Sequence, residues 1–300
     1  MNKVMTMKEA ISKYVHNGDT LFISGCQHGE PAAAVHEIIR RKIRHLTLIC
    51  ALANSSSLLI GEGCLDRLIT GYSPQDPARG YALTKAIKNN TKPVYEESSH
   101  FAIALALLAG YMGVPFMPTK CLLGSDMLKY NENIGSTKCP FTDETVGAVK
   151  AVVPDIGIIH VQRADAEGNA QKWGTLGVDL EGINASKNVI VTTEKIVDSD
   201  IIRRDPNRTI IPGFRVNAVV EQPWGAFPMH LAGCYNGDMF GSMAEMRDEE
   251  SYENFMKKFI YGVKDWNEYL KARREFKGDE YFDALEIKEP IYSEPVIHGY

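Results

Sequence analysis

The stretch from Ala148 to Gly174 constrains the fold more than any other part of the chain. Its first half is apolar and rich in β-branched residues, and it contains a short run bounded by chain breakers, formed by Ile156, Ile158, Ile159 and Val161. Such a run is typical of a strand buried on both faces of a parallel sheet. The second half, from His160 to Asn169, is polar. Because ligands of open α/β sheets bind beyond the carboxyl ends of the strands, this loop indicates a site, although an ordinary turn explains the same residues.

Predicted strands and helices alternate along most of the chain. Strands are predicted at 20–24, 46–52, 65–70, 94–96, 189–193 and 219–221, and helices at 32–41, 77–89 and 100–112. A further helix begins at Thr6, which has the capping-box spacing to Glu9. The alternation predicts crossover βαβ units, and so an open, mostly parallel sheet with helices on both faces.

The C-terminal part has a different pattern. Apolar residues between Tyr252 and Leu270 recur with a period of 3.6, which predicts one long amphipathic helix. Residues 131–145 are predicted to form a surface excursion, and residues 289–300 an extended tail. We therefore expect a single α/β domain over residues 1–300, with a sheet core at 1–245 and the C-terminal helix and tail at 246–300.

Composition excludes several classes of partner. The 300 residues carry a net charge of -5 without a basic block, which argues against binding to nucleic acid or to an anionic membrane. The six cysteines are scattered and form no CxxC pair, as expected for reduced thiols in the cytoplasm. The N-terminus lacks the apolar core of a signal peptide, and prolines interrupt the longest uncharged stretch, 101–119. We expect a cytoplasmic protein.

The common catalytic signatures are missing. The chain has no Walker A loop, GxGxxG or GxSxG motif, and no HExxH or CxxC spacing, so no metal is predicted. What remains is a set of polar loops at predicted strand ends, at residues 25–30, 54–57, 72–73, 96–100, 124–126 and 160–169. Loops at the strand ends of one parallel sheet lie close together, which predicts a site without identifying its reaction.

Several residues of these loops are candidates for the site. The candidate ligand-binding residues are Gly25, Cys26, Gln27, Ser73, Gly124 and Ser125. His28 and Glu30 have the chemistry of an acid–base pair, and His100 begins an apolar helix. Each also has a structural explanation: Cys26 as a buried thiol, Ser73 as a turn residue before Pro74, and His100 as a helix-start residue. His160 is expected to be a hydrogen-bonded core histidine rather than a base.

Five segments resemble, in order along the chain, the A subunit of glutaconate CoA-transferase and the superfamily around it: residues 3–19, 23–40, 114–126, 154–174 and 201–220. The resemblance implies a heteromer of A and B subunits with similar α/β folds, which moves CoA between an acyl-CoA and a small carboxylic acid. It implies that a B-subunit glutamate attacks the thioester. It also implies that this chain forms a wall of the acyl pocket, with Ser73, Gly124 and Ser125 in loops that face the shared site.

Two departures keep other reactions open. The relatives carry a basic residue in the loop before Pro31, and such a residue would bind a carboxylate of the substrate. This chain has no basic residue there, which argues against a dicarboxylic acid as its substrate. In a hydrolase relative a catalytic glutamate precedes the long apolar helix, where this chain has Glu97 and His100. A lyase or hydrolase acting on a CoA thioester, with one of these as base, is therefore an alternative. A non-catalytic, acyl-CoA-binding subunit is another, because the chain shows no self-contained catalytic set.

Overall fold

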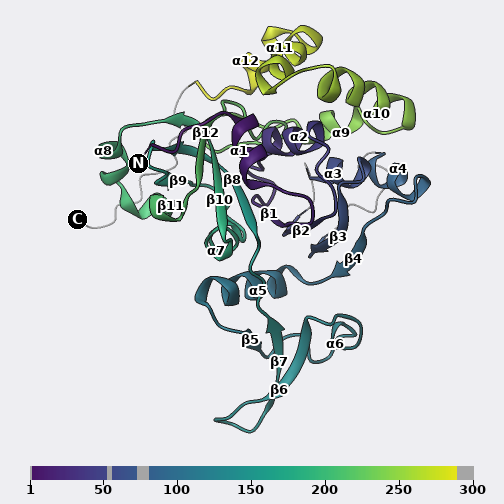
Figure 1. Ribbon diagram of the computed structural model, residues 1–300, viewed down its shortest axis with the longest axis vertical. Coiled ribbons are helices and arrows are strands. Elements are labelled where there is room, and N and C mark those ends of the chain that lie inside the picture. The colour runs from purple at the N-terminus through teal and green to yellow at the C-terminus, as the bar shows by residue number, and fades with distance from the viewer. Residues whose placement is uncertain (1, 53–55, 73–80, 289–300) are drawn as a thin grey trace.

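The computed structural model describes residues 2–52, 56–72 and 81–288, and its central feature is a nine-stranded sheet (Figure 1). Seven strands are parallel and lie in the order β12 (Ala218–Glu221), β10 (Asn188–Ile196), β8 (Ile156–Ala164), β1 (Thr20–Ile23), β2 (Leu46–Cys50), β3 (Leu65–Thr70), β4 (Val94–Glu97). Two short strands, β9 (Ala170–Gln171) and β11 (Thr209–Ile211), add antiparallel pairs beside the end of β8. The open, mostly parallel sheet predicted from the alternation is confirmed.

Helices cover both faces of this sheet, and the side chains of β1 show why. Leu21 and Ile23 point into one apolar core, whereas Phe22 between them points into the other. One face carries α1 (Met7–Tyr14), α2 (Ala32–Arg40), α3 (Ser57–Gly61) and α4 (Ala82–Lys88), and the other carries α5 (His100–Met112) and α7 (Asp179–Ala185) (Figure 1). Strands buried on both sides are the usual consequence of crossover helices.

The central strand is shorter than the stretch that predicts it. β8 pairs with β1 and β10, and eight of its nine residues are buried. Residues 148–150, however, belong to β7 (Thr145–Lys150) of another sheet. Pro154 lies between the two strands and has no backbone N–H to donate, so the ladder cannot continue through it.

A smaller antiparallel sheet lies beyond α5, away from the main sheet (Figure 1). It consists of β5 (Phe116–Thr119), β7 and β6 (Ile134–Lys138), with α6 (Met127–Tyr130) beside it. The predicted surface excursion at 131–145 is indeed mostly exposed, but it contains β6 and the start of β7. The sequence pattern does not reveal these strands, because alternation is weak where both faces of a strand meet water.

The prediction of one long C-terminal helix is wrong. Two short helices, α8 (Ser199–Arg203) and α9 (Met239–Ala244), precede this segment. The segment itself consists of α10 (Glu249–Phe255), a π-helical turn at Met256–Tyr261, α11 (Trp266–Lys277) and α12 (Asp279–Leu285). The break falls before Asp265, whose carboxylate accepts a hydrogen bond from the Glu268 N–H at 2.9 Å and so begins a new helix. The apolar face itself is buried from Tyr252 to Trp266 as predicted.

Within the described ranges, the longest helix has 13 residues, and none is both long and apolar enough to cross a bilayer. Helix α5 has an apolar sequence and runs from His100 to Met112, and Gly113 follows it as a C-cap in the left-handed region. It packs between the main sheet, through Ile103 and Leu107, and the smaller sheet, through Ala102 and Ala106. It therefore connects the two sheets.

Candidate active site

The carboxyl ends of the parallel strands lie along one edge of the main sheet, where sequence analysis places the site. The ends of β2 and β3 are connected there by the Thr70 hydroxyl, which lies 2.9 Å from the carbonyl oxygen of Tyr72 and 3.3 Å from that of Ala51. The loops that follow β1, β2, β3, β4, β8 and β10 all begin at this edge. Their side chains, however, form more than one group.

The first group is the loop between β1 and α2, held by a buried ion pair. The Gly25 N–H donates to Asp179 Oδ1 at 2.6 Å, and Lys172 Nζ lies 2.5 Å from Asp179 Oδ2. Neither charged side chain is exposed. Burial raises the pKa of Asp179, and the Lys172 ammonium opposes that shift. Gly25 has φ +109°, and a Cβ there would overlap the Glu30 side chain, so this position requires glycine.

His28 is part of the same framework. Its Nδ1 lies 2.9 Å from the carbonyl oxygen of Thr175, and its Nε2 accepts a hydrogen bond from the Ala232 N–H at 3.0 Å. The proton therefore resides on Nδ1 of a neutral ring. Burial, assisted by the charge of Lys172, lowers the pKa of His28 to about 4. With both nitrogens engaged, His28 positions the loop, and this geometry does not form the predicted acid–base pair with Glu30.

The remaining residues of this loop differ in their exposure. Glu30 is buried, Cys26 is half-buried, and Gln27 is exposed with φ +61°. Desolvation, with the nearby charges of Asp179 and Glu30, raises the pKa of Cys26, which keeps it a thiol at neutral pH. Gln27 is therefore the side chain of this loop best placed to meet a ligand.

The second group lies at the β4–α5 corner. Glu97 and Ser125 line an open groove of about 670 Å³ together with Tyr130 and Asn131. The Asn131 amide donates to the Glu97 carbonyl oxygen at 2.7 Å. The Ser125 N–H and hydroxyl both donate to the Leu122 carbonyl oxygen, at 2.9 and 2.8 Å, so this N–H is not directed at an anion.

His100 is the first residue of α5 and does not line this groove. It is exposed, and its ring packs so closely on Gly71 that a Cβ there would overlap it. The Ser99 hydroxyl, not His100, caps the helix by accepting from the Ala102 N–H at 3.0 Å. Gly124 is exposed beside Ser125. Glu97 and His100 can exchange protons with a ligand, whereas Gln27 can only bind one.

The two groups are separate. Strands β2 and β3 lie between β1 and β4, so three strand spacings, about 14 Å, separate their ends. The structure therefore keeps Gly25, Cys26, Gln27, His28 and Glu30 in one loop and brings Glu97 and Ser125 to one groove, with His100 and Gly124 close to them in the chain. It does not merge the two sets. Ser73 lies outside the described residues.

Sequence analysis does not predict two buried networks of polar side chains at this edge. One is the Lys172–Asp179 pair described above. The other surrounds Glu194 of β10, which lies 2.7 Å from His160 Nε2 and accepts a 2.9 Å hydrogen bond from the Tyr235 hydroxyl. His160 Nδ1 lies 2.8 Å from the Thr192 hydroxyl, so His160 is the buried, hydrogen-bonded core histidine expected. No motif marks these partners, because they become neighbours only after folding.

Comparison with known proteins identifies the family to which this chain belongs. Residues 4–222 match the model of the family described as Coenzyme A transferase. The chain is 36% identical to the A subunit of 3-oxoadipate CoA-transferase from Pseudomonas knackmussii, over 90% of this chain and 97% of the relative. It is 32% identical to the A subunit of glutaconate CoA-transferase from Acidaminococcus fermentans, over 90% and 91%, respectively. This chain belongs to the Coenzyme A transferase family.

Solved structures agree. The crystal structure of glutaconate coenzyme A-transferase from Acidaminococcus fermentans superposes with a TM-score of 0.84 and 30% identity, covering 95% of this chain and 96% of that one. The decarboxylase AibA/AibB superposes with a TM-score of 0.70 and 27% identity, covering 86% and 100%. The predicted resemblance and fold are confirmed. Within the described parts of the chain, no cluster of three or more His, Cys, Asp or Glu side chains suits a metal ion.

Proposed function

We propose that this chain is the A subunit of a heteromeric CoA-transferase, which moves CoA between an acyl-CoA and a small carboxylic acid. The observation that carries the proposal is similarity along nearly the full length of two A subunits, 97% and 91% of their chains. A partner B subunit would supply the glutamate that attacks the thioester. The acyl group would pass to that glutamate as a mixed anhydride while CoA leaves, and CoA would then return to give a glutamyl thioester and the free acid.

The chain's own contribution would be a preorganised wall of the shared cleft. Gly25, Cys26 and Gln27 lie in a loop held by His28 and Asp179, so substrate binding would not have to order it. Gly124 and Ser125 would contribute from the other group, and Ser73 would contribute from the part of the chain between the two groups. We place the whole of residues 1–300 in one domain, and the enzyme in the cytoplasm, where its six unpaired cysteines would stay reduced.

Co-expression with a B-type partner tests this proposal. We expect the purified complex to transfer CoA from an acyl-CoA to a free carboxylate, and each chain alone to be inactive. Each half-reaction can be followed by isotope exchange between the free acid and its CoA ester. A complex that only hydrolyses or decarboxylates its thioester would support the alternative reactions, and a complex that binds acyl-CoA without turnover would support a non-catalytic role for this chain.

A further inference from the structure

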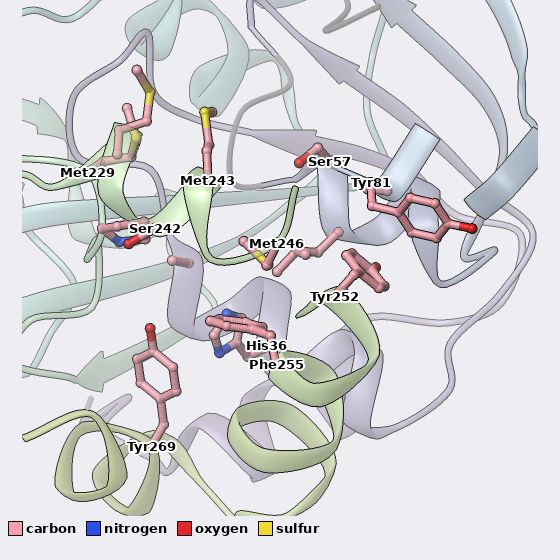
Figure 2. A pocket seen from close by; sticks show the side chains of 15 residues that line it. His36, Ser57, Tyr81, Met229, Ser242, Met243, Met246, Tyr252, Phe255 and Tyr269 are labelled. Atoms are coloured by element: carbon pink, nitrogen blue, oxygen red, sulfur yellow. The ribbon is translucent and has the colours of Figure 1, made fainter. Parts of the chain in front are cut away.

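A second cavity lies on the α2 side of the sheet, and Figure 2 shows the side chains that line it. Among its lining residues are Ala32, Ser57 and Ala82, the first residues of α2, α3 and α4. These helices follow β1, β2 and β3, so the places where they begin adjoin the carboxyl ends of those strands. A group that reaches past the strand ends on this side would therefore meet the cavity.

The cavity is small, apolar and adaptable. Its lining includes four methionines, Met229, Met239, Met243 and Met246, and Figure 2 labels all of them except Met239. Methionine side chains are flexible and adjust to irregular ligands. The volume of the cavity is about 50 Å³. An apolar cavity of roughly 150 Å³ holds the six carbons of benzene, so this one suits a group on the order of two carbons, such as the end of a short acyl chain.

The lining also contains polar side chains. His36 Nδ1 and Ser242 Oγ are buried and have no hydrogen-bond partner among the described residues. Their side chains are about 3% and 4% exposed. Burial, with the positive charges of Arg40 and Arg273 nearby, lowers the pKa of His36 well below its usual value, so its ring is neutral. Each of these groups can form a hydrogen bond with an uncharged polar atom of a ligand.

A carboxylate would be disfavoured in the same place. The described lining contains no lysine or arginine, and the two arginines near His36, Arg40 and Arg273, are already paired with Glu37 and Glu245. An unpaired anion in an apolar site carries a large desolvation penalty. The loop before α2 likewise has no cation, since it reads Cys26, Gln27, His28, Gly29 and Glu30, and its histidine is neutral. Two independent features of this edge therefore oppose an acyl group that ends in a second carboxylate.

We infer that this cavity is the acyl-chain pocket of the enzyme and that its substrate is a short, uncharged acyl group rather than a dicarboxylic one. The inference rests on the proposed function and adds the substrate class to it. It also distinguishes this chain from the two A subunits it is similar to, whose names specify the dicarboxylic acids 3-oxoadipate and glutaconate.

Binding of matched CoA esters to the assembled A–B complex tests the inference. Butyryl-CoA and succinyl-CoA both carry four carbons, and they differ by the terminal carboxylate. By calorimetry we expect butyryl-CoA to bind at least about tenfold tighter, the scale on which pockets discriminate small differences. Ser242→Leu, which fills the cavity, should weaken butyryl-CoA binding by about tenfold or more and change acetyl-CoA binding by less than about threefold.

A matched control lies on the same helix. Phe240 in α9 is 75% exposed and does not line the cavity, so Phe240→Ala should leave both affinities unchanged. Met243→Trp fills the cavity from another position and replaces Ser242→Leu if that variant does not fold. Equal binding of butyryl-CoA and succinyl-CoA, or filling variants that leave butyryl-CoA binding unchanged, would overturn the inference. A complex that shows the expected binding but transfers no CoA would instead overturn the proposed function alone.

Discussion

Lys172 and Asp179 form an ion pair in which neither side chain is exposed, 2.5 Å apart. We expect Lys172→Met to lower the free energy of unfolding by about 3–5 kcal/mol, because it leaves a buried carboxylate unpaired. Adding Asp179→Asn should recover most of this loss, since the amide oxygen can still accept from the Gly25 N–H. Denaturant unfolding measures both.

The control for this prediction is an exposed pair. Lys187 lies 2.7 Å from Asp155, with side chains 61% and 37% exposed. Lys187→Met should change the free energy of unfolding by less than about 1 kcal/mol. A double variant no more stable than Lys172→Met alone would show that the buried charge is not what destabilises the single variant.

His28 predicts a pH dependence of stability. Its pKa is about 4 in the folded chain and 6.5 without burial, so the unfolded chain takes up the proton first as the pH falls. The contribution of this group is therefore complete above pH 6.5 and is lost as the pH falls toward 4, by up to about 3 kcal/mol. Denaturation at a series of pH values should show a steeper slope in the wild type than in His28→Asn, where the slope that remains comes from the other buried histidines, such as His36. The exposed His45 is the control, and His45→Asn should keep the slope.

Glu97 and His100 separate the proposed transferase from its alternatives. If the nucleophile belongs to the partner subunit, Glu97→Gln and His100→Ala should each retain transfer within about tenfold of the wild type, a barrier change of about 1.4 kcal/mol. Steady-state assays of the A–B complex with each variant measure this. Loss of turnover by about a thousandfold in either variant would identify an in-chain base, as a lyase or hydrolase requires.

At the scale of elements, the C-terminal segment shows both what pattern reasoning finds and what it misses. The apolar period from Tyr252 to Leu270 identifies the buried face correctly. The same period continues across the break, so it does not reveal where one helix ends and the next begins. The local signal is Asp265 with Glu268 three residues later, a spacing that places a helix start inside the predicted helix.

This cap gives a prediction for the element. Asp265→Ala should lower the free energy of unfolding by about 1 kcal/mol, because the Glu268 N–H at the start of α11 loses its acceptor. Asp283 of α12 is exposed and does not cap that helix, so Asp283→Ala should have little effect. Thermal unfolding of the two variants compares them directly. Equal stability of the two variants would mean that packing of Trp266, not the cap, determines where α11 begins.

At the scale of the whole molecule, sequence patterns predict the parallel sheet because burial on both faces leaves a strong signal in each central strand. They also predict which edge of the sheet carries the site, because the polar loops follow the carboxyl ends of these buried strands. Sequence patterns do not predict that Glu97 and His100 lie three strands away from Gly25 and His28, because a local pattern does not determine the order of the strands in the sheet. The Lys172–Asp179 and His160–Glu194 contacts are equally inaccessible to such patterns, because each joins segments whose sequences carry no shared motif.

The central claim is that this chain forms one wall of a cleft whose nucleophile belongs to a partner chain. The most direct measurement is to incubate the A–B complex with acyl-CoA, trap with borohydride or hydroxylamine, and locate the modified residue by mass spectrometry of both chains. We predict a modified glutamate on the partner chain and none on this one. A trapped residue on this chain, or CoA transfer by this chain alone at the rate of the complex, would contradict the account.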